Sequence, residues 1–532
     1  MSDKRLNTRA AGIVAIAVMC SRLLGLAREL IFASLFGAGR GMDAFFTAFK
    51  APNLLRDLFA EGALSTAFIT VFSKKITTEG DGSAWALASK MATLAVVFMS
   101  AVSLAGVIFA EPLIFVLAPG FDAEKAAFTI LLTRIMYPFI LLVSLAALAM
   151  GMLNAKNIFG VPAMASSFFN IGSIAGGVFF GWWIDPTFGE KALIGLALGT
   201  LVGGLLQLAV QLPSLWKVGF RFHPDFKWRD AGVKLVIGLM IPSIIAASAV
   251  QVNVMVNAIF ASYLQDGAVS WLQYAFRLLQ LPIGVFGVAI ATVTLPLISR
   301  LAATTVGPDF RQALGRALRL AIFLTLPAAA GLAMLAVPII GLIYQRGSFT
   351  AEATLRTGEA LQLYAIGLVG YSCIKVLSPA FYAIDRRWTP MLVSFVSIAL
   401  NVGMNYLFIF KLGMGHRGLA LSTAISATLN FLALFLLMRR FAGGLESLHF
   451  LFTVIKCAVA TAALAAVCYF GGQYAHSWLI EGGLLHRGLA LFAIIGVAGL
   501  TYLIVCWILR VQEIHDATTV VRRKFLSLRS KK

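Results

Sequence analysis

The stretch SRLLGLAREL, residues 21–30, lies inside an apolar run that extends from about residue 10 to residue 36. It contains Arg22, Arg28 and Glu29. A charged side chain at the centre of a bilayer costs roughly 2.5 to 3.5 kcal/mol on insertion scales, unless it faces a partner or a water-filled cavity. The stretch therefore predicts a membrane-crossing helix with a polar face turned toward the inside of a larger protein.

The composition supports a chain that crosses the membrane many times. Of its 532 residues, 60% are hydrophobic and 12% are charged, whereas soluble domains carry about 25% charged residues. Because a helical span needs roughly 20 apolar residues, we predict an all-α polytopic membrane protein with about 14 transmembrane helices. The runs lie at about 10–36, 43–72, 84–117, 126–153, 159–184, 192–215, 235–264, 270–298, 316–344, 358–384, 388–410, 418–438, 451–471 and 486–509.

The net charge of +20 reflects membrane topology rather than nucleic-acid binding. If the N-terminus is cytoplasmic, most lysines and arginines outside the predicted spans fall on the cytoplasmic side, as the positive-inside rule requires. We therefore expect both termini in the cytoplasm and attraction to anionic membrane lipid, with no nucleic-acid partner.

Fragments of sequence recur at a nearly constant offset. IFAS at 31–34 returns at 259–262, and GFDAE at 120–124 is echoed by SFTAE at 348–352. The repeat unit contains six spans, an even number, so both copies enter the bilayer in the same orientation. Parallel repeats of this kind occur in transporters, with a substrate site between the lobes. We predict an N-terminal lobe at 1–220, a C-terminal lobe at 221–445, a helix pair at 446–512, a basic cytoplasmic tail at 513–532, and a central cavity.

The second span reads MDAFFTAFKAPNLLRDLFAEGALSTAF, residues 42–68. At 100° per residue, its ionisable residues Asp43, Lys50, Asp57 and Glu61 fall within about 40° of one another on a helix. Pro52 predicts a kink, because proline removes a backbone donor and clashes with the preceding turn. Arg56 points away from this stripe unless the kink or local unwinding redirects it.

We interpret these residues as an anion site. Arginine suits such a site because its planar guanidinium group forms paired hydrogen bonds to phosphate oxygens and stays charged when it is partly shielded from water. The candidate binding residues are Arg22, Arg28, Arg56 and Arg277, and the residues expected to hold them or to form a gate are Glu29, Asp43, Lys50, Asp57 and Glu61. Ion pairs that merely lock helices together are the alternative, although they would leave no excess of basic groups.

The first two spans, together with YAFRLLQLPIGVFGVAIATVTLPLIS at 274–299, resemble the MurJ/MviN family, the lipid II flippases of the MOP exporter superfamily. The resemblance covers essentially the whole chain. It implies a flippase that moves undecaprenyl-pyrophosphate-linked disaccharide pentapeptide, lipid II, to the outer leaflet of the bacterial inner membrane for peptidoglycan synthesis, with the cell-wall synthesis machinery as a further partner.

The same resemblance implies roles for particular residues. The family's cavity arginines fall on Arg22, Arg28, Arg56 and Arg277, and its second-span acids fall on Asp43 and Glu61. The last two helices of such proteins form a hydrophobic groove for the polyprenyl tail. Asp57 stands where a second arginine is common in the family, which puts in doubt any ion-pair gate copied from relatives.

The sequence also bears on the energy source of transport and on other possible functions. No phosphate-binding loop is present, so we expect transport by alternating access driven by an electrochemical gradient, with no cofactor. The five cysteines show no ligand spacing, and we predict neither a metal site nor bound sodium. The alternatives are another oligosaccharide-lipid or drug exporter of the superfamily, whose cation-exporting members should have acid-dominated cavities, and a membrane enzyme acting on polyprenyl phosphates. We expect a transporter rather than an enzyme.

Overall fold

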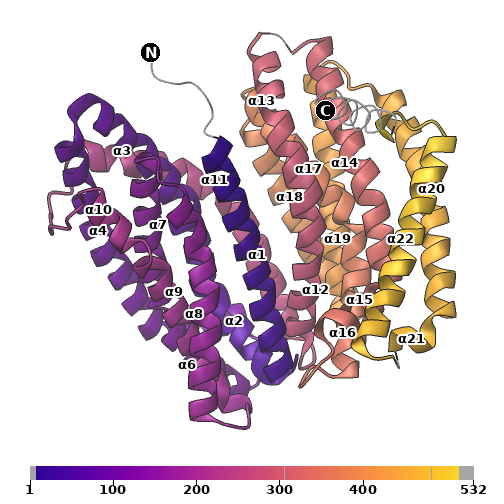
Figure 1. Ribbon diagram of the computed structural model, residues 1–532, viewed down its shortest axis with the longest axis horizontal. Helices are drawn as coiled ribbons and strands as arrows, with labels where there is room; N and C mark the ends of the chain where they lie inside the picture. Colours follow the sequence, from indigo (N-terminus) through magenta and orange to yellow (C-terminus); the bar gives the residue numbers. More distant parts are fainter. Residues whose placement is uncertain (1–7, 305, 481, 515–532) are drawn as a thin grey trace, which may run out of the picture. The chain divides into compact units, whose positions relative to one another are not determined.

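The computed structural model describes residues 8–304, 306–480 and 482–514 (Figure 1). Within these ranges a few side chains, including that of Glu61, lie outside the description, as does nearly all of the predicted basic tail. Every described element is a helix, which confirms the predicted fold class.

The chain forms two compact units. The first comprises residues up to Ser270 together with Arg346–Thr350, and the second comprises Trp271–Gln345 and the residues from Ala351 onward. The first unit contains α1 (Thr8–Phe36), α2 (Arg40–Leu55), η1 (Arg56–Leu64), α3 (Ser65–Glu79), α4 (Asp81–Ile108), α5 (Ala110–Leu117), α6 (Ala123–Met136), α7 (Phe139–Ala155), α8 (Gly160–Ile184), η2 (Glu190–Ala192), α9 (Leu193–Ala209), α10 (Leu212–Lys217) and α11 (Ala231–Ser262).

Helix α12 (Ala268–Pro282) begins at the end of the first unit and continues into the second. The remaining helices of the second unit are η3 (Ile283–Val288), α13 (Ala289–Thr304), α14 (Pro308–Met334), α15 (Ala336–Tyr344), α16 (Ala351–Ile366), α17 (Leu368–Ala383), α18 (Trp388–Tyr406), η4 (Leu407–Lys411), α19 (Gly415–Phe441), α20 (Ser447–Tyr474), α21 (His476–Ile480) and α22 (Leu484–Ile508).

Many of these helices can cross a membrane. Among the described residues, ten helical segments, some of them made of consecutive helices, are long and apolar enough by length and composition, or up to twelve if each of two bent pairs is one span. The long helical stretches 8–36 and 40–79 are not among those counted. The predicted number of fourteen therefore stays a prediction.

The sequence repeat is matched by the order of the helices. Helix α6 begins at Ala123 and α16 at Ala351, and the break between α4 and α5 recurs between α14 and α15. The predicted lobe boundaries follow this repeat, whereas the compact units follow packing and divide after Ser270. Helix α11, which starts the second repeat, therefore belongs to the first compact unit, and the predicted domain ranges stay predictions.

Small residues let α8 and α9 pack backbone to backbone. A Cβ atom at Gly199 would lie 2.3 Å from the backbone nitrogen of Gly177, and one at Gly203 would lie 2.7 Å from the carbonyl oxygen of Phe169. Close approach through glycine is a usual way for membrane helices to associate, because lipid tails are as apolar as leucine and only tight packing favours the protein contact.

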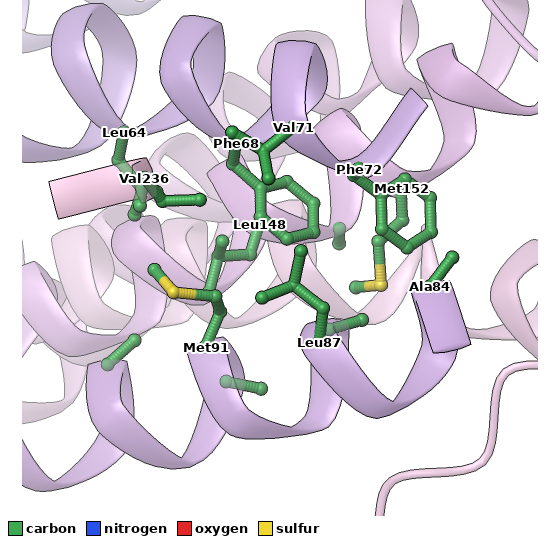
Figure 2. Close-up of a cluster of buried hydrophobic side chains, with 14 of the residues drawn as sticks. Leu64, Phe68, Val71, Phe72, Ala84, Leu87, Met91, Leu148, Met152 and Val236 are labelled. Atoms are coloured by element: carbon green, nitrogen blue, oxygen red, sulfur yellow. The ribbon is translucent and has the colours of Figure 1, made fainter. Parts of the chain in front are cut away.

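A cluster of buried apolar side chains joins η1, α3, α4, α7, α10 and α11 of the first unit (Figure 2). Phe68 and Phe72 of α3 stack with ring centroids 5.1 Å apart, and Leu87 of α4 and Met152 of α7 belong to the same cluster. Val236 brings in α11, which explains why that helix groups with the first unit.

The second unit contains a buried charge network. Arg319 of α14 is 4% exposed and donates hydrogen bonds to Glu513 at 2.9 Å and to Glu446 at 2.8 Å. Glu446 precedes α20 and Glu513 follows α22. A single guanidinium group therefore ties both C-terminal helices to α14.

The α8–α9 contact predicts the effect of adding one methyl group. We expect Gly199→Ala to destabilise the protein by about 1 to 3 kcal/mol, the usual cost of overpacking, because the methyl group meets backbone that cannot move aside. Thermal unfolding of purified protein measures this effect. Gly496→Ala in α22, where no atom lies within 4 Å of the added Cβ, is the matched control and should leave stability unchanged or slightly raised; equal effects of the two substitutions would contradict the packing explanation.

Candidate functional site

Arg22 and Arg28 of α1 differ in their exposure to solvent. Arg22 is exposed, whereas the side chain of Arg28 is 20% exposed and its Nη2 atom lies 3.9 Å from Oε1 of Glu29. The Arg28 guanidinium carbon also lies 5.4 Å from the centre of the Phe169 ring of α8. Contact with an aromatic face stabilises a cation that has lost part of its water. Arg28 thus lies near the carboxylate of Glu29, at a distance close to the upper limit for an ion pair, and against the ring of Phe169.

The helix that begins at Arg40 changes its form shortly after Pro52. It remains α-helical to Leu55 and becomes a π-helix at Arg56, while the predicted kink at Pro52 stays a prediction. Turns of this type are rare and occur frequently at functional sites. Arg56 Nη2 lies 3.0 Å from Oδ1 of Asp57, and the amide of Gln251 in α11 lies 3.4 Å from the other oxygen of Asp57.

The second repeat has the same backbone feature without the charges. Pro282 ends α12, and a π-helix begins at Ile283, 227 residues after the one at Arg56. Its sequence, IGVFGV, is wholly apolar. Only the first copy of this feature therefore carries ionisable residues.

Lys50 lies one turn before the break and faces an apolar cavity. This cavity has a volume of about 120 Å³, and its lining includes Leu54, Leu113, Tyr137 and Val254. No ion pair within the described residues involves Lys50. Lys50 thus lies among apolar side chains and is attracted electrostatically by Asp43 without an ion-pair contact.

Asp43 is the most fully enclosed acid of the predicted site, with 0% of its surface exposed. It accepts hydrogen bonds from the backbone nitrogens of Gly267 at 2.7 Å and Ser270 at 2.8 Å and from the Ser270 hydroxyl at 2.6 Å. Lys125 Nζ lies 3.1 Å from it. One carboxylate therefore joins α2, α6 and the start of α12.

The Asp43 network continues toward the surface of the first unit. Lys125, which is 3% exposed, also donates to Asp266 at 2.8 Å. Arg40 holds Asp122 in a two-point hydrogen bond with distances of 2.6 and 2.5 Å and lies 3.4 Å from Asp266. The outer charges thus form one continuous cluster, which we call the Asp43 cluster: Arg40, Asp43, Asp122, Lys125, Asp266 and Ser270.

The Asp43 cluster changes the titration of its outer acids. Hydrogen bonds from Arg40 hold the pKa of Asp122 well below its ordinary value. Burial acts to raise the pKa of Asp266, but hydrogen bonding and the charge of Lys125 outweigh it, so that this pKa is lowered as well. Both acids therefore stay ionised well below neutral pH.

A short loop from between α15 and α16 packs in the first unit. The backbone nitrogen of Ser348 donates to the carbonyl oxygen of Ser34 at 2.8 Å, and the Ser348 hydroxyl donates to the carbonyl oxygen of Leu35 at 2.9 Å. Gly37, with φ of +70°, ends α1 beside this loop, where a Cβ atom would lie 2.5 Å from Ser348 O. We call Arg346–Thr350 the strap.

Sequence reasoning found part of this arrangement. Arg22, Arg28, Glu29, Lys50, Arg56 and Asp57 lie in the first unit, while Arg277 is half-buried on α12 in the second unit; the side chain of Glu61 lies outside the described residues. That these groups share one chamber stays a prediction. Lys125, Asp266, Ser270 and the strap were missed, because Lys125 and Asp266 read as ordinary loop charges.

No group of three or more histidine, cysteine, aspartate or glutamate side chains that could hold a metal ion occurs in the part of the chain that the structure describes. An apolar cavity of about 340 Å³ lies in the second unit. Its lining comes from α12, α14, α15, α20 and α22 and includes Pro282, Leu335, Leu464 and Ile495.

The fold is that of the MOP superfamily of transporters. The chain is similar to an inward-facing multidrug resistance MATE family transporter of that superfamily, with a TM-score of 0.65 at 17% identity, over 82% of this chain and 99% of that chain. It is also similar to a solved structure of the lipid II flippase MurJ in an inward closed conformation, with a TM-score of 0.71 at 26% identity, over 91% and 97% of the two chains.

Sequence comparison defines the family. The model of the lipid II flippase MurJ family matches residues 32–486. A probable lipid II flippase MurJ of Buchnera aphidicola subsp. Acyrthosiphon pisum is 35% identical over 94% of this chain and 97% of its own length. The lipid II flippase MurJ of Burkholderia cenocepacia is 36% identical over 81% and 84%. The chain belongs to the lipid II flippase MurJ family, as its motifs predicted.

The geometry around Asp43 predicts a graded response to substitution. Asp43→Ala leaves the buried Lys125 ammonium and two backbone donors without their acceptor, so we expect a loss of about 3 to 5 kcal/mol. Ser270→Ala removes one hydrogen bond to a charged group and should cost about 1.5 to 3 kcal/mol. Chemical or thermal unfolding in detergent measures both losses. A larger loss for Ser270→Ala than for Asp43→Ala would contradict this account.

The lowered pKa values of Asp122 and Asp266 predict loss of stability in acid. A carboxyl group whose pKa is lower in the folded than in the unfolded protein stabilises the fold above its unfolded pKa of about 4, and the effect is lost as the pH falls. We therefore expect the unfolding temperature of the wild type to exceed that of Asp122→Asn at pH 6 and the gap to narrow as the pH approaches 3. A gap that is constant with pH would rule out the Arg40–Asp122 pair as its source.

Proposed function

We propose that this chain moves lipid II across the cytoplasmic membrane, as the name of its family states for its relatives. The observation that carries the proposal is the combination of family membership over nearly the whole chain with half-buried arginines on apolar helices. Arg28 lies beside Glu29 and Arg56 beside Asp57, and Arg22 is exposed and makes no ion pair with a described residue.

The arginines would bind the pyrophosphate of the substrate. Arg22, Arg28, Arg56 and Arg277 supply planar donors that match phosphate oxygens. The partial burial of the Arg28 side chain, which is 20% exposed, supports this role, because arginine stays charged in a partly dry site and forms strong hydrogen bonds to phosphate there. Glu29, Asp57 and Glu61 would keep these cations in place when no substrate is bound.

The apolar cavity of the second unit would take part of the polyprenyl tail. Its volume of about 340 Å³ and its apolar lining suit a hydrocarbon chain, which gains free energy in proportion to the apolar surface removed from water. Arg319 supports this role indirectly, since it fixes the helices α20 and α22 that form one wall.

Transport would proceed by alternating access. Residues 267–270 supply donors to Asp43, and the chain enters the second unit directly after them. The strap, residues 346–350, is joined to the second unit at both of its ends. A movement of the second unit would pull on both, so breaking and remaking them would accompany each cycle. The membrane potential acts on charged groups with about 2.3 kcal/mol per charge per 100 mV and would drive the return step.

The proposed setting is the inner membrane of a bacterium. Both termini would lie in the cytoplasm, because that orientation places most basic residues on the cytoplasmic side. The partners would be lipid II, the surrounding membrane lipid and the enzymes that use lipid II for cell-wall synthesis.

Substitution of Arg28 tests the proposed function. Arg28→Ala removes charge-assisted hydrogen bonds to the pyrophosphate worth about 1.5 to 3 kcal/mol, so we expect at least a tenfold loss of lipid II translocation with little loss of folding. Appearance of lipid II in the outer leaflet of cells that depend on this chain measures the effect. Arg300→Gln, at an exposed arginine of α13, is the control. Normal translocation by a folded Arg28→Ala protein would remove the anion-site proposal.

A reversible cross-link tests alternating access. The 2.8 Å backbone hydrogen bond between Ser348 and Ser34 places these residues close enough for a disulfide, which spans Cα separations of roughly 4.4 to 6.8 Å. We expect oxidised Ser34→Cys/Ser348→Cys protein to stop translocating and to recover on reduction. Each single cysteine variant controls for the oxidant. Undiminished transport by the fully cross-linked protein would show that the strap stays in place throughout the cycle.

A further inference from the structure

The connection between α9 and α11 forms a surface that the transport function does not use. It contains α10 and an extended run that ends at Asp230, the N-cap of α11. We call residues 212–230 the connecting segment. The candidate membrane spans on its two sides are Glu190–Lys217 and the bent pair Ala231–Ile245 and Val250–Ser262, so we expect the segment at the surface of the bilayer.

The inner side of the connecting segment is fixed to the protein. Leu215 and Phe220 are buried in the apolar cluster of the first unit, and the Phe220 ring lies 5.5 Å from that of Trp85. The backbone nitrogen of Asp225 donates to Thr93 Oγ1 at 3.0 Å. These contacts set which side chains of the segment can turn outward.

The outer side presents three large aromatic side chains. Trp216 is 54% exposed, Phe222 is 48% exposed and Phe226 is 65% exposed. Aromatic side chains are enriched at both membrane–water interfaces, where their rings sit at the level of the headgroups. Their position beside two membrane helices therefore matches that level of the bilayer.

Basic side chains also occur in the connecting segment and at the start of α11. Lys217, Arg221, Lys227, Arg229 and Lys234 are all exposed. Arg221 donates to the carbonyl oxygens of Trp216 and Phe220, both at 3.0 Å. No ion pair within the described residues involves Lys217, Lys227 or Arg229.

The acids near this surface are already engaged. Asp230 lies 2.8 Å from Lys90 and accepts the backbone hydrogen bond of Gly232, and Asp225 accepts from the backbone nitrogen of Lys227 at 2.9 Å. On the neighbouring helices, Glu79 pairs with Lys75 and Asp81 with Lys156. The outer side of the connecting segment thus keeps an excess of positive charge.

We propose that the connecting segment docks on the anionic phospholipids of the adjacent leaflet, with Trp216, Phe222 and Phe226 among the headgroups and the basic side chains on their phosphates. Exposed rings and unpaired cations on one short, fixed segment match a surface that is both apolar and negatively charged. A soluble acidic protein would match the charges but would not explain three exposed rings at the membrane level.

A fluorescent label at the segment tests the proposal. Phe226→Cys, labelled with an environment-sensitive dye, is placed in nanodiscs of phosphatidylcholine alone or of phosphatidylcholine with phosphatidylglycerol. We expect a blue shift and protection from an aqueous quencher in the anionic nanodiscs and a return toward the zwitterionic values at high salt, because salt screens exposed charges. The unsubstituted chain, treated in the same way, controls for label on native cysteines.

Charge variants make the test specific. Lys227→Gln with Arg229→Gln should remove most of the difference in emission and quenching between the two kinds of nanodisc, since each basic residue near such a surface contributes about as much as a fivefold change in binding. Arg439→Gln with Arg440→Gln, a pair of exposed basic residues at the end of α19, is the charge-matched control and should leave the preference unchanged.

Two results would overturn the proposal. One is equal emission and equal quenching in both kinds of nanodisc, which is measured on the wild-type charges and does not depend on any charge variant being stable. The other is protection of the label that appears only after a soluble cell extract is added, which would identify a protein as the occupant. The nanodiscs contain no lipid II, so either outcome leaves the proposed transport function untouched.

Discussion

A charged group that leaves water must find replacement partners, and in this chain that constraint is met most completely at Asp43. Its two oxygens receive two backbone N–H groups, a hydroxyl and an ammonium. These donors come from segments 82 to 227 residues away in the sequence. The carboxylate is therefore acceptable only when α2, α6 and the start of α12 are correctly assembled, and the position of the half-buried cations along α2 and η1 follows from that assembly.

The first unit contains two kinds of interaction that respond differently to pH, salt and water. The glycine contacts of α8 and α9 and the apolar cluster around Phe68 depend on shape and change little with pH or salt. The Asp43 cluster and the strap consist of hydrogen bonds and charges, several of them partly exposed. The partly exposed contacts can be exchanged for water at moderate cost, whereas the buried contact between Asp43 and Lys125 cannot.

The sequence predicted the helical membrane fold and the family, because these depend on local composition and on sequence motifs, whereas the stripe of ionisable residues on the second span stays a prediction. Pro52 is followed by the change from α-helix to π-helix at Arg56, whereas the kink that it predicts is a statement about helix direction and stays a prediction. The partners of Asp43 could not be predicted, because nothing near Lys125 or Ser270 in the sequence indicates which distant helix each will meet. The repeat likewise located the two copies but not the grouping of α11 with the first, which arises from the packing of Val236 and its neighbours.

The π-helical turns that follow Pro52 and Pro282 also have a consequence for the evolution of this chain. Each residue advances a helix by about 100°, so an extra residue accommodated in a wide turn rotates everything that follows. The aromatic face of α3, with Phe68 and Phe72 turned into the core, is in register only because η1 precedes it. A single deletion within 56–64 would tend to restore an ordinary helix and turn that face toward lipid, so insertions and deletions should be tolerated far less in this short segment than its rather polar composition suggests.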